Sequence, residues 1–260
     1  MKFPFRLGTS SYIIPADILP NVYYLAGKVQ DVELVLFDVD GGPSNLPTPA
    51  QIAELHSFAA DHDLTFTVHL PLDLRMAADG GPAHISLEKA LRVIELTQAL
   101  HPWAYIAHLD GRDILPAETT TPAAILRWQD QAVQALEIVG SWVGDLNKLA
   151  LENLESYPLE LNLAVLERIA VSRTVDVGHL WLDGHAPLPY LRAALPRTRV
   201  VHIHGISEHD HSSLAHVPPA ELGAVFAELV SSNYTGVVTL EVFSEQDFLG
   251  SIQAIELVTA

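Results

Sequence analysis

Histidine is concentrated in one short stretch of this sequence. Five of the 13 histidines lie in VVHIHGISEHDHSSLAH, between Val200 and His216. Cysteine is absent, which excludes disulfides, thiolate metal sites and cysteine nucleophiles. Imidazoles combined with carboxylates, and without sulfur, suit Zn²⁺, Mn²⁺, Fe²⁺ or Co²⁺ better than Ca²⁺. The alternatives are therefore a site for divalent metal ions and a surface loop that merely tolerates histidine.

Further metal-binding residue types recur along the chain, each at or just beyond the end of a short apolar run. They are His69, His108, Glu152, Asp176, His179, His202, His204, Asp210, His211 and Glu241. A single histidine in such a place, for example His69, is more often an ordinary polar residue. Buried carboxylates, however, are costly unless they are paired or bind a metal, and the chain has only 14 Lys and Arg. The recurrence on six successive runs favours a metal site.

Short apolar runs that alternate with amphipathic segments must position these residues. The expected strands are 5–11, 32–37, 65–71, 103–110, 148–154, 173–180, 198–205 and 236–243. Such brief, nearly continuous apolar runs are typical of strands buried on both faces of a parallel sheet. Helices are expected at 48–63, 84–101, 121–143 and 218–232. In the second of these, Leu87, Leu91, Ile94 and Leu96 are expected to form the apolar stripe.

Eight strand–helix repeats in 260 residues predict an α/β fold, a closed (β/α)₈ TIM barrel, forming one domain over residues 1–260. A doubly wound open sheet is the alternative, but the first strand is not followed by a glycine-rich phosphate loop. Barrel enzymes place their active sites where the strands end. The candidate ligands would then form a ring at that end.

The ligand set exceeds what one tetrahedral ion needs. Nine residues are expected to bind metal: His69, His108, Glu152, Asp176, His179, His202, Asp210, His211 and Glu241. This set predicts two or three divalent ions, Zn²⁺ or Mn²⁺, with Glu152 and Glu241 as bridges. Multi-metal sites stabilise the attacking and leaving oxygens in phosphoryl transfer. A single-metal site would instead polarise a sugar carbonyl and its enediolate.

The charge and composition of the chain restrict the classes of partner that it can bind. The formal net charge is −18, which argues against a nucleic-acid partner or an anionic membrane, because phosphate contacts require a basic surface. The start of the chain lacks the apolar core of a signal peptide, and no apolar run is long enough to span a bilayer. We expect a cytoplasmic protein with a small-molecule substrate.

The ring of ligands resembles the xylose isomerase-like barrel superfamily, which includes endonuclease IV and many sugar isomerases and epimerases. The endonuclease IV pattern has histidines after strands three and four, a Glu-Asn pair after strand five, Asp-x-x-His after strand six, His after strand seven and Glu after strand eight. The matching residues are His69, His108, Glu152, Asp176, His179, His202 and Glu241. Sugar isomerases usually keep only the two glutamates, the aspartate and the strand-seven histidine, so the additional histidines favour the phosphodiesterase branch.

The loop after the seventh expected strand departs from that pattern. Endonuclease IV has Asp-x-His there, whereas in SEHDHSSL Asp210 and His211 are adjacent and His209 takes the spacing position. The ligands of a third ion therefore stay open.

A closer resemblance is to the cobamide-remodelling phosphodiesterases of this superfamily, carried by FRLGTSSYIIPADILPNVYYLAGKVQDVELVLF and HIHGISEHDHSSL. It implies a metal-dependent hydrolase that cleaves the nucleotide-loop phosphodiester of cobamides such as cobalamin, giving cobinamide phosphate and an α-riboside for corrinoid remodelling. Glu152, Glu241 and His204 would be catalytic, with His204 donating a proton or holding a phosphate oxygen. Ser11 and Tyr12 would contact substrate, although Tyr12 can equally be a packing residue. A sugar or sugar-phosphate isomerase or epimerase is the alternative.

Overall fold

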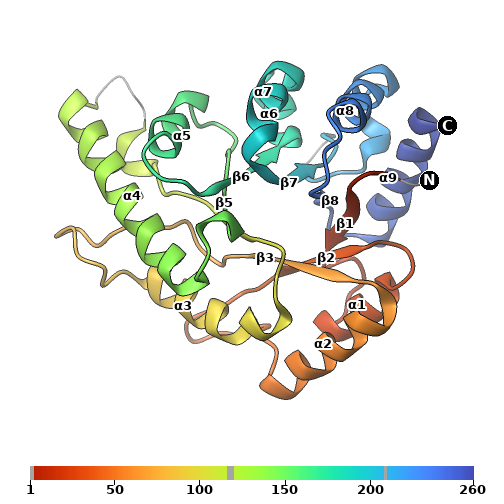
Figure 1. Cartoon of the computed structure of the whole chain (residues 1–260), viewed down its shortest axis with the longest axis horizontal. Helices are drawn as coiled ribbons and strands as arrows, with labels where there is room; N and C mark the ends of the chain where they lie inside the picture. Colours follow the sequence, from red (N-terminus) through yellow and green to blue (C-terminus); the bar gives the residue numbers. More distant parts are fainter. Residues whose placement is uncertain (1–2, 116–119, 208–209) are drawn as a thin grey trace.

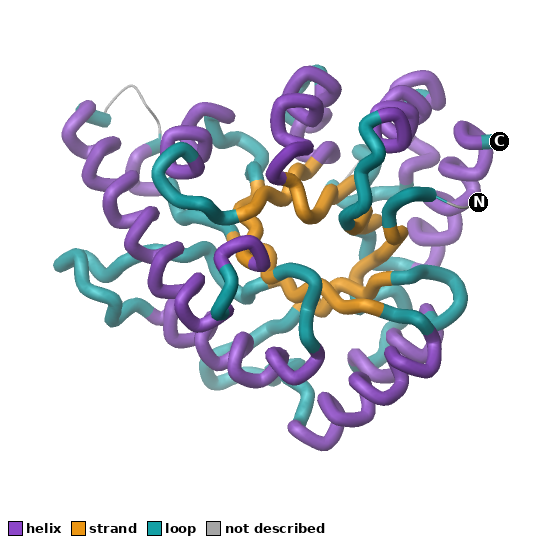
Figure 2. Tube along the Cα trace, in the orientation of Figure 1, coloured by secondary structure: helices purple, strands orange, loops and turns teal. Residues whose placement is uncertain are grey.

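Eight parallel strands close into a barrel, as the sequence predicts. The computed structural model describes residues 3–115, 120–207 and 210–260. The strands pair in chain order, and β8 pairs with β1. Their bounds are β1 Arg6–Ser10, β2 Asp31–Val35, β3 Thr65–His69, β4 Tyr105–Ala107, β5 Leu149–Glu152, β6 Ser172–Asp176, β7 Thr198–Ile203 and β8 Val237–Leu240. Figure 2 shows these strands as an inner ring surrounded by helices.

The helices cover the outside of the barrel (Figure 1). Their bounds are α1 Ile18–Leu25, α2 Pro49–His62, α3 Ile85–Thr97, α4 Pro122–Val143, α5 Leu159–Leu166, α6 Val177–Leu182, α7 Pro187–Ala194, α8 Pro219–Ser231 and α9 Glu245–Thr259. Short 3₁₀ turns lie at Gln98–Leu100, Arg112–Ile114, Leu146–Lys148, Leu195–Arg197 and Leu214–His216. In the ranges that the structure describes, no helix is both long and apolar enough to cross a membrane.

Local sequence signals explain where several helices begin and end. Thr48 caps α2 through a capping box with Gln51, and Pro49 occupies the first turn. Helix α4 ends at Gly144, whose φ of 79° is a left-handed conformation that favours glycine. The apolar stripe of α3 differs from the predicted one. Its buried residues are Ser86, Leu87, Lys89, Ala90, Val93, Ile94 and Thr97, whereas Leu91 and Leu96 are half-buried.

The sixth strand is shorter than predicted. It ends at Asp176, whose side chain accepts a 2.7 Å hydrogen bond from the backbone N–H of His179 and caps α6. The apolar run 173–180 hides this change, because the first turn of α6 is as buried as the strand before it. His179 therefore lies on a helix and not on a strand. Five helices lie outside the four helical ranges predicted, namely α1, α5, α6, α7 and α9.

Register explains why the polar residues share one interior. Register-paired neighbours in a parallel barrel point to the same side, and Asp176, His202 and Thr239 are paired across β6, β7 and β8. On the opposite wall, Glu33 pairs with Ser10 and Thr67. Ala150 and Val200 belong to a small apolar cluster inside the barrel. Between this cluster and the carboxyl ends of the strands, the interior is lined by polar side chains.

Candidate metal centre

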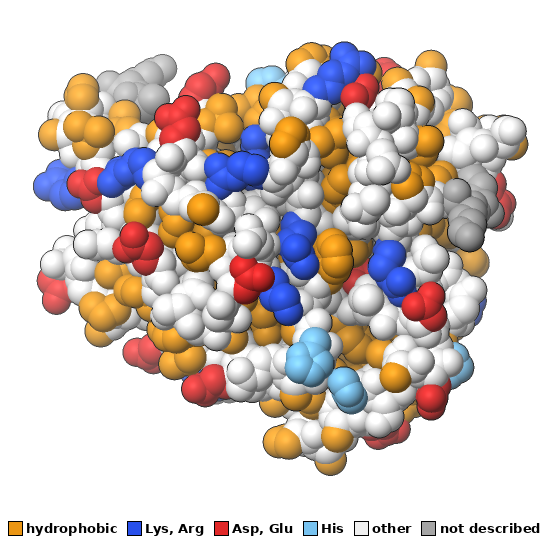
Figure 3. All heavy atoms as spheres, in the orientation of Figure 1, with side chains coloured by type: hydrophobic (Ala, Val, Ile, Leu, Met, Phe, Trp, Pro, Cys, Tyr) orange, Lys and Arg blue, Asp and Glu red, His pale blue; other side chains and the backbone are white. Residues whose placement is uncertain are grey.

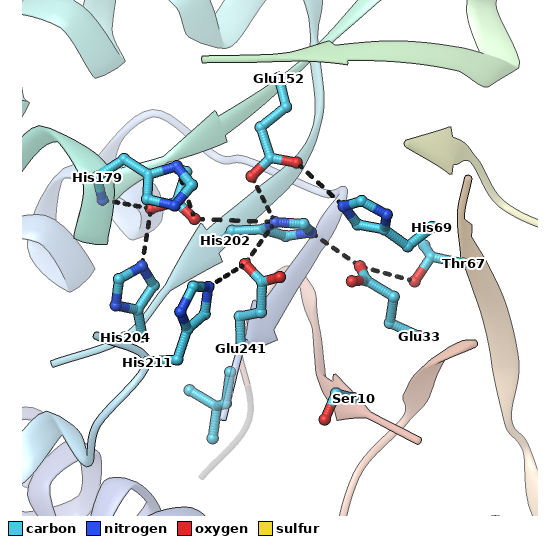
Figure 4. Close-up of polar contacts among 12 residues, drawn as sticks. Ser10, Glu33, Thr67, His69, Glu152, His179, His202, His204, His211 and Glu241 are labelled. Atoms are coloured by element: carbon cyan, nitrogen blue, oxygen red, sulfur yellow. Dashed lines mark hydrogen bonds and ion pairs between the residues drawn. The ribbon is translucent and has the colours of Figure 1, made fainter. Parts of the chain in front are cut away.

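Glu152 connects two parts of the centre. Its Oε2 atom lies 3.0 Å from His108 Nε2 and 3.8 Å from His69 Nε2, while its Oε1 atom lies 2.9 Å from His202 Nδ1. The side chain of Asn162 holds the Glu152 carbonyl oxygen at 2.8 Å. Glu152 thus stands between His69 at the end of β3 and His202 of β7 (Figure 4), and His108, one residue after β4, lies on the His69 side.

His202 lies among further carboxylates and is fully buried. Its Nδ1 atom is 3.0 Å from Glu241 Oε2 and 3.9 Å from Asp176 Oδ2. Asn153 fixes Asp176 by exchanging two 3.0 Å hydrogen bonds with its backbone. The Glu-Asn pair after β5 therefore supplies one candidate ligand and one residue that positions another.

A third cluster lies beside β6 and β7. His204 Nε2 is 3.4 Å from Asp176 Oδ1, and His204 Nδ1 is 3.2 Å from Asp210 Oδ1. The rings of His204 and His211 stack with centroids 4.3 Å apart. A β-carbon at Gly178 would lie 2.2 Å from His204 Nε2, so the glycine leaves the space that this imidazole occupies.

The predicted residues converge into three groups whose potential ligand atoms lie within 4.8 Å of one another. The groups are His69, His108 and Glu152; then Glu152, Asp176, His202 and Glu241; then His179, His204, Asp210 and His211. Glu152 belongs to two of them, which suits a bridging carboxylate, whereas Glu241, also expected as a bridge, belongs to one and lies 3.6 Å from His211 of the third. His204, expected as a proton donor, joins the third group with its geometry suited to a ligand. His209 lies outside the described residues.

The donor atoms fit metal ions. Asp176 Oδ2, Glu241 Oε2 and His204 Nε2 are buried and form no hydrogen bond, although each lies within 4 Å of an ion-pair partner. Buried polar atoms almost always have hydrogen-bond partners. Three such atoms that face the same centre therefore indicate that a further group, such as a metal ion, completes their interactions. Mixed nitrogen and oxygen donors without sulfur match Zn²⁺ or Mn²⁺.

Ring hydrogen bonds direct one nitrogen of several histidines toward the centre. His69 Nδ1 lies 2.9 Å from the Leu70 carbonyl oxygen, His179 Nδ1 lies 3.0 Å from that of Asn153, and His204 Nδ1 lies 3.2 Å from that of Gly205. Since a carbonyl oxygen only accepts, each Nδ1 donates and leaves Nε2 available as a ligand atom.

The histidines and carboxylates of the centre pair with one another, and this pairing shifts their pKa values. Burial lowers the pKa of His108, but hydrogen bonds with Asp73 and Glu152 outweigh it and raise that pKa to about 10. Burial likewise opposes the charge of His204, and Asp176 nonetheless raises its pKa to about 9. Burial raises the pKa of Glu152, yet His202 and His108 hold it well below its usual range.

Three acidic residues at the centre were not predicted. Glu33 Oε2 lies 2.8 Å from His202 Nε2, Asp73 Oδ1 lies 3.3 Å from His108 Nδ1, and Glu155 Oε2 lies 3.3 Å from His179 Nε2. Glu33 had a signal, because it is an acidic residue inside the apolar run VELVLF. Asp73 and Glu155 lie in loops, where acidic residues are common.

The two residues expected to contact substrate differ in their surroundings. Ser11 is buried, and its hydroxyl accepts a 3.1 Å hydrogen bond from the backbone N–H of Val35. Tyr12 is exposed, and its ring packs edge-on against Phe37 with centroids 5.6 Å apart. Ser11 is thus engaged within the fold, whereas Tyr12 stands beside a residue of the cleft described next.

A cleft of about 560 Å³ opens over the centre, and members of all three groups line it. Its lining includes His69, His108, Glu152, His179, His211 and Glu241. Its exposed large apolar residues are Phe37, Leu72 and Phe243, which are 44%, 40% and 43% exposed. The cleft therefore joins the candidate ligands to an apolar rim, defined here as these three residues.

The family model of the xylose isomerase-like TIM barrel matches residues 29–258. The chain belongs to this family. No curated protein sequence matches the chain.

Several solved structures share the fold of this xylose isomerase-like barrel at low sequence identity. A D-tagatose 3-epimerase-like protein is 17% identical with a TM-score of 0.73, and the match covers 98% of this chain and 97% of that one. An L-ribulose 3-epimerase is 20% identical with a TM-score of 0.67, covering 98% of both chains. Endonuclease IV from Thermus thermophilus is 16% identical with a TM-score of 0.69, covering 97% of this chain and 99% of that one. At such identities the likeness establishes the fold alone.

Proposed function

We propose that this xylose isomerase-like barrel is a metal-dependent phosphodiesterase that acts on cobamides. Water would add across the nucleotide-loop phosphodiester, giving cobinamide phosphate and an α-riboside. The observation that carries the proposal is that the three groups of candidate ligands adjoin one another: Glu152 belongs to the first two, and Asp176 of the second contacts His204 of the third. A sugar epimerase with one metal needs none of His69, His108 or His179 as metal ligands, yet all three direct Nε2 toward the centre.

The residues that would hold the ions are those of the three groups. When bound, two or three divalent ions would polarise the phosphodiester oxygens and lower the pKa of the attacking water. Glu152 and Glu241 concentrate negative charge beside His202, which holds them in place. Asp176 and Asp210 flank His204, whose Nε2 would bind the ion of the third group; without that ion the same nitrogen would instead hold a phosphate oxygen or donate a proton.

The apolar rim supports a substrate larger than a sugar. Phe37, Leu72 and Phe243 stay more than a third exposed at the mouth of the cleft. Arg112 is the sole Lys or Arg of the lining, within the part of the chain that the structure describes, and Asp110 already pairs with it at 2.6 Å. A duplex groove would require many free cations. A phosphodiester that carries a broad apolar surface suits these walls better than DNA does.

A sugar isomerase or epimerase is the second candidate. The group Glu152, Asp176, His202 and Glu241 is fully buried and is by itself a complete single-metal site. These four residues correspond to the two glutamates, the aspartate and the histidine that sugar isomerases of this superfamily usually keep. On this alternative the histidines of β3 and β4 would contact substrate and bind no metal.

The test is anaerobic incubation of the protein, loaded with Zn²⁺ or Mn²⁺, with adenosylcobalamin, followed by chromatography with mass detection. Cobinamide phosphate and α-riboside are expected with the wild type and not with Glu152→Gln. Intact cobamide under both metals, together with turnover of a ketose, would replace the proposal with the epimerase.

A further inference from the structure

Glu33 is a fully buried carboxylate on β2 that lies behind His202 and outside the three groups of candidate ligands. Its Oε2 atom is 2.8 Å from His202 Nε2 and 3.5 Å from Thr67 Oγ1 (Figure 4). Its Oε1 atom has no hydrogen-bond partner. Within the described ranges no Lys or Arg forms an ion pair with Glu33, so the imidazole of His202 is its principal partner.

His202 differs from three other histidines of the centre in which ring nitrogen faces the candidate ligands. His69, His179 and His204 each donate from Nδ1 to a backbone carbonyl oxygen and leave Nε2 for the centre. His202 has the reverse arrangement. Its Nδ1 faces Glu152 and Glu241, and its Nε2 faces away toward the barrel interior and Glu33.

No backbone carbonyl fixes the tautomer of His202, because every hydrogen-bond or ion-pair partner of its ring among the described residues is a carboxylate. The proton can therefore stay on either nitrogen unless one partner is preferred. A buried imidazole that binds metal through one nitrogen needs a strong acceptor on the other. A carboxylate is a stronger acceptor than a carbonyl oxygen, since it carries charge.

We propose that Glu33 is the positioning residue of this centre. It accepts the proton of His202 Nε2 and thereby holds Nδ1, unprotonated, toward Glu152, Asp176 and Glu241. This inference rests on the metal centre of the proposed function and does not depend on the substrate. Glu33 acts through His202, because it lies on the opposite side of the ring from the other candidate ligands.

Asp31 provides a matched control. It lies two residues earlier on the same strand, is fully buried, and points into the same interior. Its carboxylate, however, accepts its hydrogen bonds from Thr65 at 2.6 Å and Thr67 at 2.9 Å. Asp31→Asn therefore removes a buried charge of the barrel interior without removing the partner of the imidazole.

The experiment uses Zn²⁺ alone as the probe and reads the ¹⁵N shifts of the His202 ring in the zinc-loaded protein, with His202→Gln to assign the signals. The wild type is expected to carry its ring proton on Nε2 and the metal on Nδ1. A proton on Nδ1 would overturn the inference, and this result needs no variant of Glu33.

Zinc affinity, measured by competition with a chelator, is the second readout. Glu33→Gln is expected to raise the dissociation constant of the weakened site about 10- to 100-fold, the range for partners of metal-bound histidines. Glu33→Asp should recover part of this loss, and Asp31→Asn should stay within about threefold of wild type, well below that range. Equal affinity in wild type and in a folded Glu33→Gln would contradict the inference. If Glu33→Gln does not fold, Glu33→Asp and the wild-type tautomer decide.

Both readouts are independent of turnover. Absence of cobamide hydrolysis, with the expected tautomer and affinities, would overturn the proposed function and leave the role of Glu33 intact. Hydrolysis by a Glu33→Gln protein with unchanged zinc affinity would do the opposite.

Discussion

The two ends of the barrel hold charge in different ways. Where the strands begin, Arg197 donates to the carbonyl oxygens of Leu166, Ile169 and Val171, and Arg199 stacks over Trp103 with 4.1 Å to the ring centroid. This face is turned toward the viewer in Figure 3, which shows Lys and Arg side chains around its middle. These arginines are held by neutral groups of the fold.

Where the strands end, charged groups face one another. Histidines and carboxylates pair within 4 Å, and three of their buried atoms form no hydrogen bond. The larger cavity, about 790 Å³, lies at the arginine end, compared with about 560 Å³ at the histidine end. Cavity size therefore does not identify the site. The site is identified instead by buried nitrogen and oxygen atoms that form no hydrogen bond. These atoms lie at the strand ends, where barrel enzymes place their active sites.

The largest expected effect comes from Glu152, because two groups share it. Glu152→Gln should lower cobamide hydrolysis by about 10³-fold, as removal of a group that contacts the reacting centre does. It should also destabilise the metal-free protein by about 3 kcal/mol, since it leaves His108 and His202 charged without their partner. Turnover and chemical denaturation measure the two effects. Unchanged values in both would place the centre elsewhere.

The second effect is the pH dependence of zinc binding. The raised pKa values of His108, about 10, and His204, about 9, mean that both carry protons at neutral pH in the metal-free protein. Their ion pairs stabilise that form fully below the unfolded pKa of about 6.5, and this stabilisation is lost as pH rises through 9 and 10. Because metal binding must displace these protons, zinc affinity should rise at least about tenfold per pH unit between pH 7 and 9.

Competition titrations at three pH values measure this slope. Asp73→Asn provides the control, since Asp73 is a partner that raises the pKa of His108. The variant should show a shallower slope. A pH-independent affinity in the wild type would mean that these histidines do not bind the ion.

A change at the other end should separate stability from function. Trp103 donates from Nε1 to the Arg199 carbonyl oxygen at 3.0 Å and packs on the small cluster of Ala104, Ile106, Ala150 and Val200. Trp103→Ala should lower the free energy of unfolding by about 3 kcal/mol, as truncation of a packed aromatic does. Zinc stoichiometry should stay that of wild type. Loss of metal from this variant would show that the two ends are not independent.

The smallest effect is expected at the apolar rim. Leu72→Ser removes part of an apolar contact worth about 1 kcal/mol, so the KM for adenosylcobalamin should rise about fivefold with little change in kcat. Steady-state kinetics separates the two. An unchanged KM would mean that the broad face of the substrate lies elsewhere.

The sequence was sufficient to predict the site residues that lie at strand ends. His69, Glu152 and Glu241 each terminate an apolar run, and a parallel barrel brings such ends together. His179 was harder, because the helix that carries it is as apolar as the strand before it. The signal was present, since Asp176 three residues earlier is a good helix N-cap.

The acidic residues that reach the histidines from loops could not be predicted from the sequence. Asp73 and Glu155 reach their histidines from segments without periodicity, so nothing in the pattern distinguishes them from surface acids. Glu33 shows the opposite case. Its place inside an apolar strand marked it as unusual, but only the closed barrel shows that β7 supplies its partner.

Metal content tests the central claim most directly. The purified wild type, equilibrated with Zn²⁺ and freed of excess ion, should retain two or three ions per chain by elemental analysis. Glu152→Gln should lose the ions of both groups that share it, and His204→Ala should lose the third alone. One ion per chain that is retained in His69→Ala and His204→Ala would contradict the joined centre and would indicate the single-metal site of an epimerase.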